Sequence, residues 1–293
     1  MTLASLRKDL ISLYLDTASG CVDTREARSA VDTVLCSYFG MIFSKLISSP
    51  DKEIDGDDAT ACSSMVKRVC AGEPVQYVCG RTEFAGREFI IDNTVLIPRP
   101  DTEFLLNEVL VRAGSLIDRS SASGQGIEVL DLCTGSGIIA ISIKSEIPGI
   151  NVSASDVSES ALEIARLNAK KHNAVIDFYL SDLFLSIPKG KRFDIIASNP
   201  PYISEKEFES LDASVKCFEP ELALKGGADG ADFYRRIAAE SAEYLKKGGW
   251  LCFEIGETQA DTVTQIMKKE GFEELTVTRD IEGRDRVVCG KHE

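Results

Sequence analysis

From residue 127 onwards, apolar strand-like segments alternate with segments of helical periodicity, and this alternation constrains the fold more than any other feature of the chain. The predicted strands are 127–132, 152–155, 175–180, 193–198, 250–255, 275–278 and 286–289. The predicted helices between them are 138–145, 159–172, 231–247 and 259–270. Strands that alternate with helices form a doubly wound α/β sheet. We therefore predict a mostly parallel seven-stranded sheet whose last two strands form an antiparallel edge.

The N-terminal part of the chain has a different pattern. Apolar residues keep helical spacing through residues 1–72, whereas residues 75–97 contain short strand-like segments around Ala85-Gly86, which favour a β-hairpin. We predict three parts: a small helical bundle at 1–74, a hairpin linker at 75–97 and the α/β domain at 98–293. The bundle either binds a partner or simply packs against the rest of the chain.

Composition excludes several classes of protein. The 293 residues carry a net charge of −14, which opposes broad contact with nucleic-acid phosphates and favours a protein or a small molecule as ligand. The nine cysteines include no C-x-x-C pair, and there are only two histidines, so neither a disulfide framework nor a metal site is expected. No segment has transmembrane length, and the cytoplasm is the expected compartment.

The tetrapeptide Asn199-Pro200-Pro201-Tyr202 directly follows the strand predicted at 193–198. Two prolines end a strand because they lack N–H donors. An Asn amide, a Pro carbonyl and a Tyr ring therefore lie at a carboxyl strand end, where open α/β sheets bind ligands. Such a group suits a planar NH2 group, either an amide or the exocyclic amine of a base. A plain Pro-Pro turn is the alternative.

A glycine loop follows the first strand of the α/β domain. Gly135-x-Gly137-x-x-Ala140, with Asp156 about twenty residues further on, loosely matches a dinucleotide-binding fingerprint, so a nicotinamide dehydrogenase is one interpretation. Asp131 favours another one, because a carboxylate just before the loop can pair with the amino group of S-adenosylmethionine, which a nicotinamide dinucleotide lacks. Asp182, after the third strand, can accept a hydrogen bond from an adenine amine while Leu183 covers the ring.

With these motifs, the chain resembles the HemK/PrmC family of peptide-chain release factor glutamine N5-methyltransferases, within the class I S-adenosylmethionine-dependent methyltransferases. The resemblance runs from about Glu73 to Val288. Its markers include the segments 73–77, 84–86, 96–103, 131–137, 199–202, 218–220 and 253–256. Three positions depart from the family pattern: Cys133 replaces a glycine, Asp101 stands where Glu is usual, and Leu183 stands where some members have an aromatic residue.

The resemblance implies transfer of a methyl group from S-adenosylmethionine to the glutamine of the Gly-Gly-Gln motif in class 1 release factors. The implied catalytic and substrate-binding residues are Asn199, Pro200, Pro201 and Tyr202. The cofactor-binding residues that we predict are Asp131, Cys133, Thr134, Gly135, Ser136, Gly137, Asp156, Asp182, Leu183 and Asn199. We expect no metal, no direct nucleic-acid partner, no membrane association, and a monomer.

Several alternatives stay open at this point. An amine-directed DNA or RNA methyltransferase, acting on adenine N6 or guanine N2, would share the Asn-Pro-Pro-Tyr motif. A dehydrogenase and a non-catalytic protein with a relic cofactor site are further possibilities. Arg99 either lies near the cofactor carboxylate or substrate backbone, or forms an ion pair with Asp101 or Glu103. Glu219 is predicted to fix the loop that follows Tyr202 by hydrogen bonding.

Overall fold

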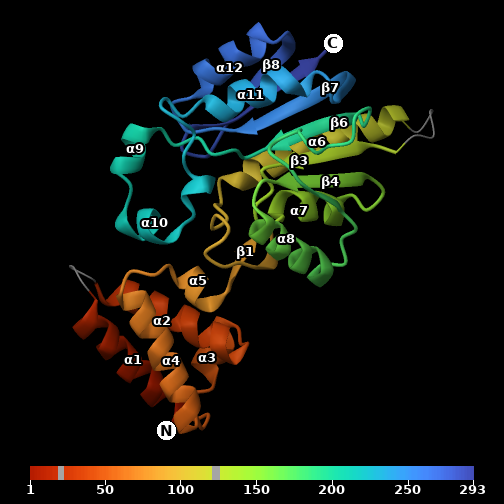
Figure 1. Cartoon of the computed structure of the whole chain (residues 1–293). Helices are drawn as coiled ribbons and strands as arrows, with labels where there is room; N and C mark the ends of the chain where they lie inside the picture. Colours follow the sequence, from red (N-terminus) through yellow and green to blue (C-terminus); the bar gives the residue numbers. More distant parts are fainter. Residues whose placement is uncertain (19–22, 121–125) are drawn as a thin grey trace. The chain divides into compact units, whose positions relative to one another are not determined.

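The computed structural model of the chain is described for residues 1–18, 23–120 and 126–293. Its internal contacts divide the chain into two compact units (Figure 1). The first unit comprises Met1–Thr82 together with Asp212–Phe218, and the second comprises Glu83–Leu211 and Glu219–Glu293. The domain boundaries predicted at 74/75 and 97/98 stay predictions. The segment Asp212–Phe218, which begins ten residues after the Asn-Pro-Pro-Tyr motif, belongs to the first unit. The sequence did not indicate this grouping.

The first unit is helical, as the spacing of its apolar residues predicts. Helix α1 is capped by Thr2, α2 by Asp23 and α4 by Asp55, and each cap side chain accepts a backbone N–H three residues further on. The core lies between α1, α2 and α4 and is formed by fully buried residues such as Leu6 and Val31. The helices of this unit are α1 (Leu3–Thr17), α2 (Thr24–Phe39), α3 (Phe43–Ser48), α4 (Gly56–Cys70), α5 (Val75–Cys79) and α10 (Ala213–Phe218).

The predicted β-hairpin is present but shorter than expected. Strands β1 (Arg81–Phe84) and β2 (Arg87–Ile90) pair across a turn at Ala85-Gly86, where both residues have positive φ. Residues 76–78 were predicted to belong to this hairpin, but they lie in the short helix α5. Pro74 precedes this helix and Gly80, with φ of 66°, ends it. A proline before the first turn and a left-handed glycine after the last are a helix signature that outweighs the strand propensity of Val and Tyr.

The second unit contains the predicted seven-stranded sheet, with strand order β5-β4-β3-β6-β7-β9-β8. All pairings from β5 to β7 are parallel, and β9 pairs antiparallel with both β7 and β8, as predicted. The strands are β3 (Glu128–Leu132), β4 (Asn151–Asp156), β5 (Asp177–Leu180), β6 (Phe193–Ser198), β7 (Leu245–Glu254), β8 (Phe272–Arg279) and β9 (Asp285–His292). The helical segments are α6 (Thr102–Ser120), α7 (Ile138–Glu146), α8 (Glu159–Lys171), α9 (Glu205–Glu209), η1 (Glu221–Ala223), α11 (Asp232–Ser241) and α12 (Ala260–Lys269).

Both faces of the sheet are covered by helices, so successive strand residues belong to different cores. Val129 and Ile195 face the core built with α6 and α7, whereas their neighbours Leu130 and Ile196 face the core built with α11 and α12. Figure 1 shows α11 and α12 on one side of the sheet and α7 and α8 on the other. This two-sided burial explains why the strands are nearly continuous apolar runs.

The helix predicted at 231–247 ends six residues early, at Ser241. The chain enters β7 at Leu245, which pairs with Phe193 of β6. Gly248 has a φ of 79°, and the register with β6 shifts between Phe193 and Ile195. The first residues of β7 therefore pair with β6 through their backbone, across an irregularity near the Gly248-Gly249 pair. Because these residues have no periodic apolar face, the apolar pattern predicted a later start for the strand.

Candidate active site

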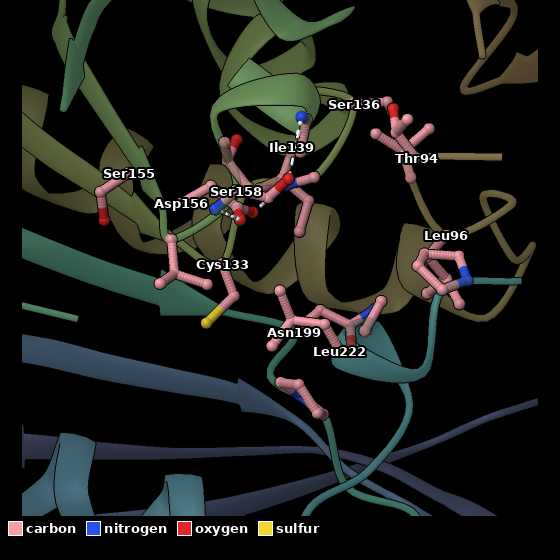
Figure 2. A pocket seen from close by; sticks show the side chains of 18 of the residues that line it. Thr94, Leu96, Cys133, Ser136, Ile139, Ser155, Asp156, Ser158, Asn199 and Leu222 are labelled. Carbon is pink, nitrogen blue, oxygen red and sulfur yellow. Dashed lines mark hydrogen bonds between the residues drawn. The ribbon is translucent and has the colours of Figure 1, made fainter. Parts of the chain in front are cut away.

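The cleft that carries the predicted site lies at the carboxyl ends of four parallel strands. From β3 outward the chain crosses to β4 and β5 on one side and to β6 and β7 on the other, so β3 and β6 flank the switch point of the sheet. Ligands bind at this place in open α/β sheets. The cleft has an empty volume of about 1170 Å³, which includes space open to solvent. Figure 2 shows Cys133, Asp156 and Asn199 around it, with Thr94 and Leu96 across from them.

The loop after β3 brings backbone to the cleft wall. Cys133, Gly135 and Gly137 have φ of 60°, 54° and 82°, so three left-handed residues turn the chain from β3 into α7. A Cβ on Gly135 would meet no atom within 4 Å, because this residue faces open space. A Cβ on Gly137 would lie 3.1 Å from that of Ala165 in α8. The first glycine therefore leaves room for a ligand, and the second allows α7 and α8 to pack closely.

Asp131 lies beneath this loop rather than in the cleft wall. Its Oδ2 accepts hydrogen bonds from the Thr134 hydroxyl at 2.6 Å and from the Ala140 backbone N–H at 3.2 Å. The residue is fully buried, and no described residue forms a hydrogen bond with its Oδ1. Burial raises the pKa of Asp131 to about 7, although the two hydrogen bonds oppose that shift. Asp131 thus shapes the loop and keeps one acceptor atom unused.

Asp156 and Asn168 complete the support of the loop. The two Asp156 oxygens accept from the backbone N–H groups of Gly135 and Ser158, both at 2.9 Å. Asn168 of α8 is buried and donates to the Ser136 carbonyl at 2.9 Å. Sequence reasoning missed Asn168, although a polar residue on the apolar face of a predicted helix could have indicated it.

Asp182 and Leu183 follow β5 and line the cleft, and their predicted contact with an adenine ring stays a prediction. Arg236 of α11 donates from one guanidinium nitrogen to both Asp182 oxygens, at 2.8 and 2.9 Å. This carboxylate is thereby held in place at the rim. The buried Leu183 side chain supplies an aliphatic surface.

Asn199 follows β6 and is the predicted substrate residue that lines the cleft together with Pro201. Its Nδ2 donates to the Thr102 hydroxyl of α6 at 3.4 Å. Pro200 and Tyr202 are not among the residues of the cleft wall. The Tyr202 ring packs against the core under α11 and α12, and burial raises the pKa of its hydroxyl. The Gln259 side chain donates to the Tyr202 carbonyl at 2.9 Å and so fixes the end of the tetrapeptide.

Arg99 and Glu219 pair with each other. The Arg99 guanidinium donates to Glu219 Oε1 at 2.5 Å, and Glu219 Oε2 accepts from the Ile97 backbone N–H at 3.2 Å. Neither ion pair predicted for Arg99 is present, because Asp101 pairs with Arg286 and the Glu103 carboxylate accepts from a backbone N–H. The prediction that Glu219 fixes the loop after Tyr202 fits these bonds, since they tie that loop to the segment before α6.

The side of the cleft opposite the glycine loop was not predicted in detail. Thr94, Leu96 and Pro98 line it from the segment before α6, and Pro220 and Leu222 line it from the loop after α10. Leu222 is 56% exposed, which is unusual for a large apolar side chain at a cleft mouth. The sequence offered one signal for this wall, namely the Pro-Arg-Pro segment at 98–100.

Two buried carboxyl groups make the stability of the second unit depend on pH. Burial raises the pKa of both Asp131 and Glu254 to about 7, so each native group keeps its proton at pH values where the unfolded group has lost it. Each group therefore contributes stability that is fully present below about pH 4, the pKa of the unfolded carboxyl group, and that is lost as pH rises through 7. The free energy of unfolding falls by an amount on the order of 3 kcal/mol for each group.

We therefore expect the free energy of unfolding of Asp131→Asn, measured relative to that of the unmodified chain, to be higher at pH 8 than at pH 5. Urea unfolding at the two pH values, followed by the fluorescence of Trp250, the single tryptophan, measures this difference. Equal effects of the substitution at both pH values would contradict the assignment.

The residues that line the cleft can bind a ligand and orient it. In the part of the chain that the structure describes, no group of three His, Cys, Asp or Glu side chains could hold a metal ion. Burial raises the pKa of the Cys133 thiol, so this cysteine is not a ready nucleophile. Among the described residues no helix is both long and apolar enough to cross a membrane.

Comparison with known proteins gives matches to both units. The family model "Methyltransferase small domain" matches residues 110–218, and "PrmC N-terminal domain" matches residues 17–80. A curated release factor glutamine methyltransferase of Koribacter versatilis is 39% identical over 92% of each chain. That of Bacillus subtilis is 40% identical and covers 89% of this chain and 90% of its own.

A solved methyltransferase structure has a similar fold. The Thermus thermophilus 16S rRNA N2 G1207 methyltransferase, in complex with AdoMet and guanosine, is 16% identical to this chain with a TM-score of 0.50. The match covers 73% of this chain and 50% of that one. At this identity the likeness concerns the fold alone.

Proposed function

Because the chain belongs to the release factor glutamine methyltransferase family, we propose that it methylates the side-chain nitrogen N5 of the glutamine in the Gly-Gly-Gln motif of class 1 peptide-chain release factors. The methyl donor is S-adenosylmethionine. The chain is a protein-glutamine methyltransferase with a methyltransferase domain and a PrmC-type N-terminal domain. We further propose that it acts as a monomer in the cytoplasm and without a metal.

One observation carries the proposal: an amide that can recognise an NH2 group lies beside a loop suited to a methyl donor. Leu132 and Ser198 are paired residues of β3 and β6, so the glycine loop and Asn199 emerge next to each other. Both line one cleft. The acceptor and the donor of the methyl group would thus meet at the switch point of the sheet.

The residues of the cleft fit S-adenosylmethionine. Gly135 faces open space, so backbone can approach a ligand closely. Leu183 offers an apolar surface for an adenine ring, and the unused Asp131 Oδ1 is a carboxylate acceptor behind the loop. Cys133, Thr134, Ser136, Asp156 and Asp182 would line the bound cofactor. When bound, the cofactor supplies a methyl group on a cationic sulfonium, an electrophile that needs no metal activation.

The task of the protein is then to orient a poor nucleophile. The nitrogen lone pair of a glutamine amide is delocalised into its carbonyl group, so the site must hold the nitrogen in line with the methyl group. The Asn199 Oδ1 and the Pro200 carbonyl are proposed to accept the two amide hydrogens. Orientation of this kind contributes up to about 7–11 kcal/mol in favourable cases. Acceptors that strengthen as the nitrogen becomes positive add electrostatic stabilisation.

Charge supports a protein substrate over a nucleic acid. The net charge of −14 disfavours a phosphate backbone, whose binding needs Lys and Arg surfaces. The stacking of Tyr202 on the substrate amide stays a prediction, because its ring packs under α11 and α12.

Labelled methyl transfer tests the proposal. The full chain is incubated with S-adenosylmethionine and each purified class 1 release factor, and a release factor with Gln→Ala in its Gly-Gly-Gln motif is the matched control. We expect label on the unmodified factor only. Label on DNA or RNA, or on the Gln→Ala factor at the same rate, would overturn the proposal.

A further inference from the structure

Glu254, the last residue of β7, lies next to Asn199 and has no part in the mechanism above. Ser198 of β6 pairs with Phe253 of β7, so the residues that follow them, Asn199 and Glu254, are neighbours across two parallel strands. Glu254 is 2% exposed, and its Oε2 has no hydrogen-bond partner among the residues that the structure describes. Burying a carboxyl group with an unsatisfied oxygen is costly, and in native proteins it calls for an explanation.

The side chains of Glu254, Thr102 and Asn199 interact with one another. The Thr102 and Asn199 side chains lie near the Glu254 carboxyl, and hydrogen bonding from them lowers its pKa against the larger, opposite effect of burial. Asn199 Nδ2 in turn donates to Thr102 Oγ1 at 3.4 Å. Thr102 is 1% exposed and Glu254 is 2% exposed, so bulk water competes little for these two side chains.

The ionised form of Glu254 fixes the direction of these hydrogen bonds. A carboxylate only accepts, so the single Thr102 hydroxyl hydrogen points to it. The Thr102 oxygen can then only accept, and it receives the Asn199 Nδ2. The Asn199 Oδ1 is left to face the cleft, where the proposed reaction needs an acceptor. A protonated Glu254 could donate to Thr102 instead, which would let Thr102 donate to Asn199 and favour the opposite orientation of the amide.

We propose that Glu254 is a positioning residue that acts through Thr102 to hold the Asn199 amide with its oxygen toward the substrate nitrogen. This inference rests on the proposed function and adds a role for two buried residues of the same site. It makes methyl transfer depend on the ionisation of a group that does not touch the substrate.

The charged and titratable groups around Glu254 permit this ionisation near neutral pH. Asp101, at the start of α6, opposes the negative charge, and Arg286 of β9 favours it. Tyr202 and Tyr234 also face Glu254, and burial raises the pKa of both hydroxyls above their ordinary value. They therefore stay neutral between pH 6 and 8. Burial raises the pKa of Glu254 to about 7, so the positioning carboxylate forms as pH rises through this value.

Three variants test the inference with saturating S-adenosylmethionine. For the unmodified chain, we expect kcat for release factor methylation to rise about tenfold between pH 6 and 8 and then level off. Glu254→Gln should lower kcat at pH 8 about tenfold, leave KM for the release factor within about twofold, and abolish the rise with pH. Thr102→Val, which keeps the side-chain shape, should behave similarly, whereas Thr102→Ser, which keeps the hydroxyl, should retain kcat within about threefold.

A kcat and pH profile of Glu254→Gln equal to those of the unmodified chain would overturn the inference. A Thr102→Ser variant as impaired as Thr102→Val would also overturn it, because packing would then be responsible rather than the hydroxyl.

A readout without catalysis separates this inference from the proposed function. The NMR signals of the Asn199 side-chain NH2 group, assigned by their loss in Asn199→Asp, should shift with a midpoint near pH 7 in the unmodified chain and not in Glu254→Gln. If these signals shift as expected but no release factor is methylated, the proposed function fails and the positioning network stands. A signal independent of pH refutes the network whatever the substrate.

Discussion

Replacing Asn199 with Ala is expected to lower the rate of methyl transfer to a release factor by about 100- to 1000-fold, the range found when one preorganised hydrogen-bonding group is removed from an active site. Alanine removes the only side-chain acceptor of the tetrapeptide that lines the cleft and leaves the glycine loop untouched. The dissociation constant of S-adenosylmethionine should therefore change by less than about threefold, although Asn199 was also predicted among the cofactor contacts. Single-turnover methylation and calorimetry measure the two quantities.

Asn107→Ala is the matched control for Asn199→Ala. Asn107 is exposed on α6, so the same chemical change there should leave both quantities unaltered. Turnover of Asn199→Ala within threefold of the unmodified chain would remove Asn199 from the mechanism. A large loss of cofactor affinity would instead assign Asn199 to the methyl donor rather than to the substrate.

The sheet and its site were predictable from the sequence because strand ends carry strong local signals. Pro200 and Pro201 cannot continue β6, and the left-handed turns after β3 favour glycine. Once the strand order follows from the alternation of strands and helices, the carboxyl ends of β3 to β6 must share one edge. The prediction of the cleft therefore needed no knowledge of side-chain packing.

Side-chain partners across the fold could not be predicted, because they depend on which loops return to the site. Arg99 finds Glu219, which is 120 residues further along the chain, rather than either acidic neighbour in its own segment. Asp131 was predicted to meet the cofactor, but the Thr134 hydroxyl and the Ala140 N–H occupy one of its oxygens from within the loop. Helix α5 shows the same limit, since the strand propensity of its residues was outweighed by Pro74 and Gly80.

Gly226 packs closely against the backbone of the Asn-Pro-Pro-Tyr tetrapeptide. The Ile203 N–H donates to the Leu224 carbonyl and the Gly226 N–H donates to the Ile203 carbonyl, both at 2.9 Å, and together they form an isolated parallel bridge between Ile203 and Lys225. Residues 224–226 are therefore held beside the end of the tetrapeptide. A Cβ on Gly226 would lie 2.7 Å from both the Pro201 carbonyl oxygen and the Tyr202 Cα, and 2.9 Å from the Gly230 carbonyl oxygen. All three are backbone atoms, so a rotamer change cannot relieve the contact.

Gly226→Ala is therefore expected to displace Pro201 and Tyr202 and to lower kcat about 100-fold, the effect of a misplacement of about 1 Å in a site that works by orientation. The added methyl group should also cost about 1–3 kcal/mol of stability, as overpacking does in a close-packed interior. Methylation kinetics at a temperature well below the unfolding midpoint separate the two effects. Affinity for S-adenosylmethionine should change little, because Gly226 is not among the residues that line the cleft.

Gly149→Ala is the matched control for Gly226→Ala. A Cβ on Gly149 would meet no atom within 4 Å, and its φ is not in the left-handed region, so the same substitution should leave kcat and stability unchanged. A Gly226→Ala variant that keeps the kcat of the unmodified chain would mean that the backbone of the tetrapeptide can move without loss of rate. Catalysis would then not depend on a fixed Pro200 carbonyl, and the two-acceptor arrangement proposed for the substrate amide would reduce to Asn199 alone.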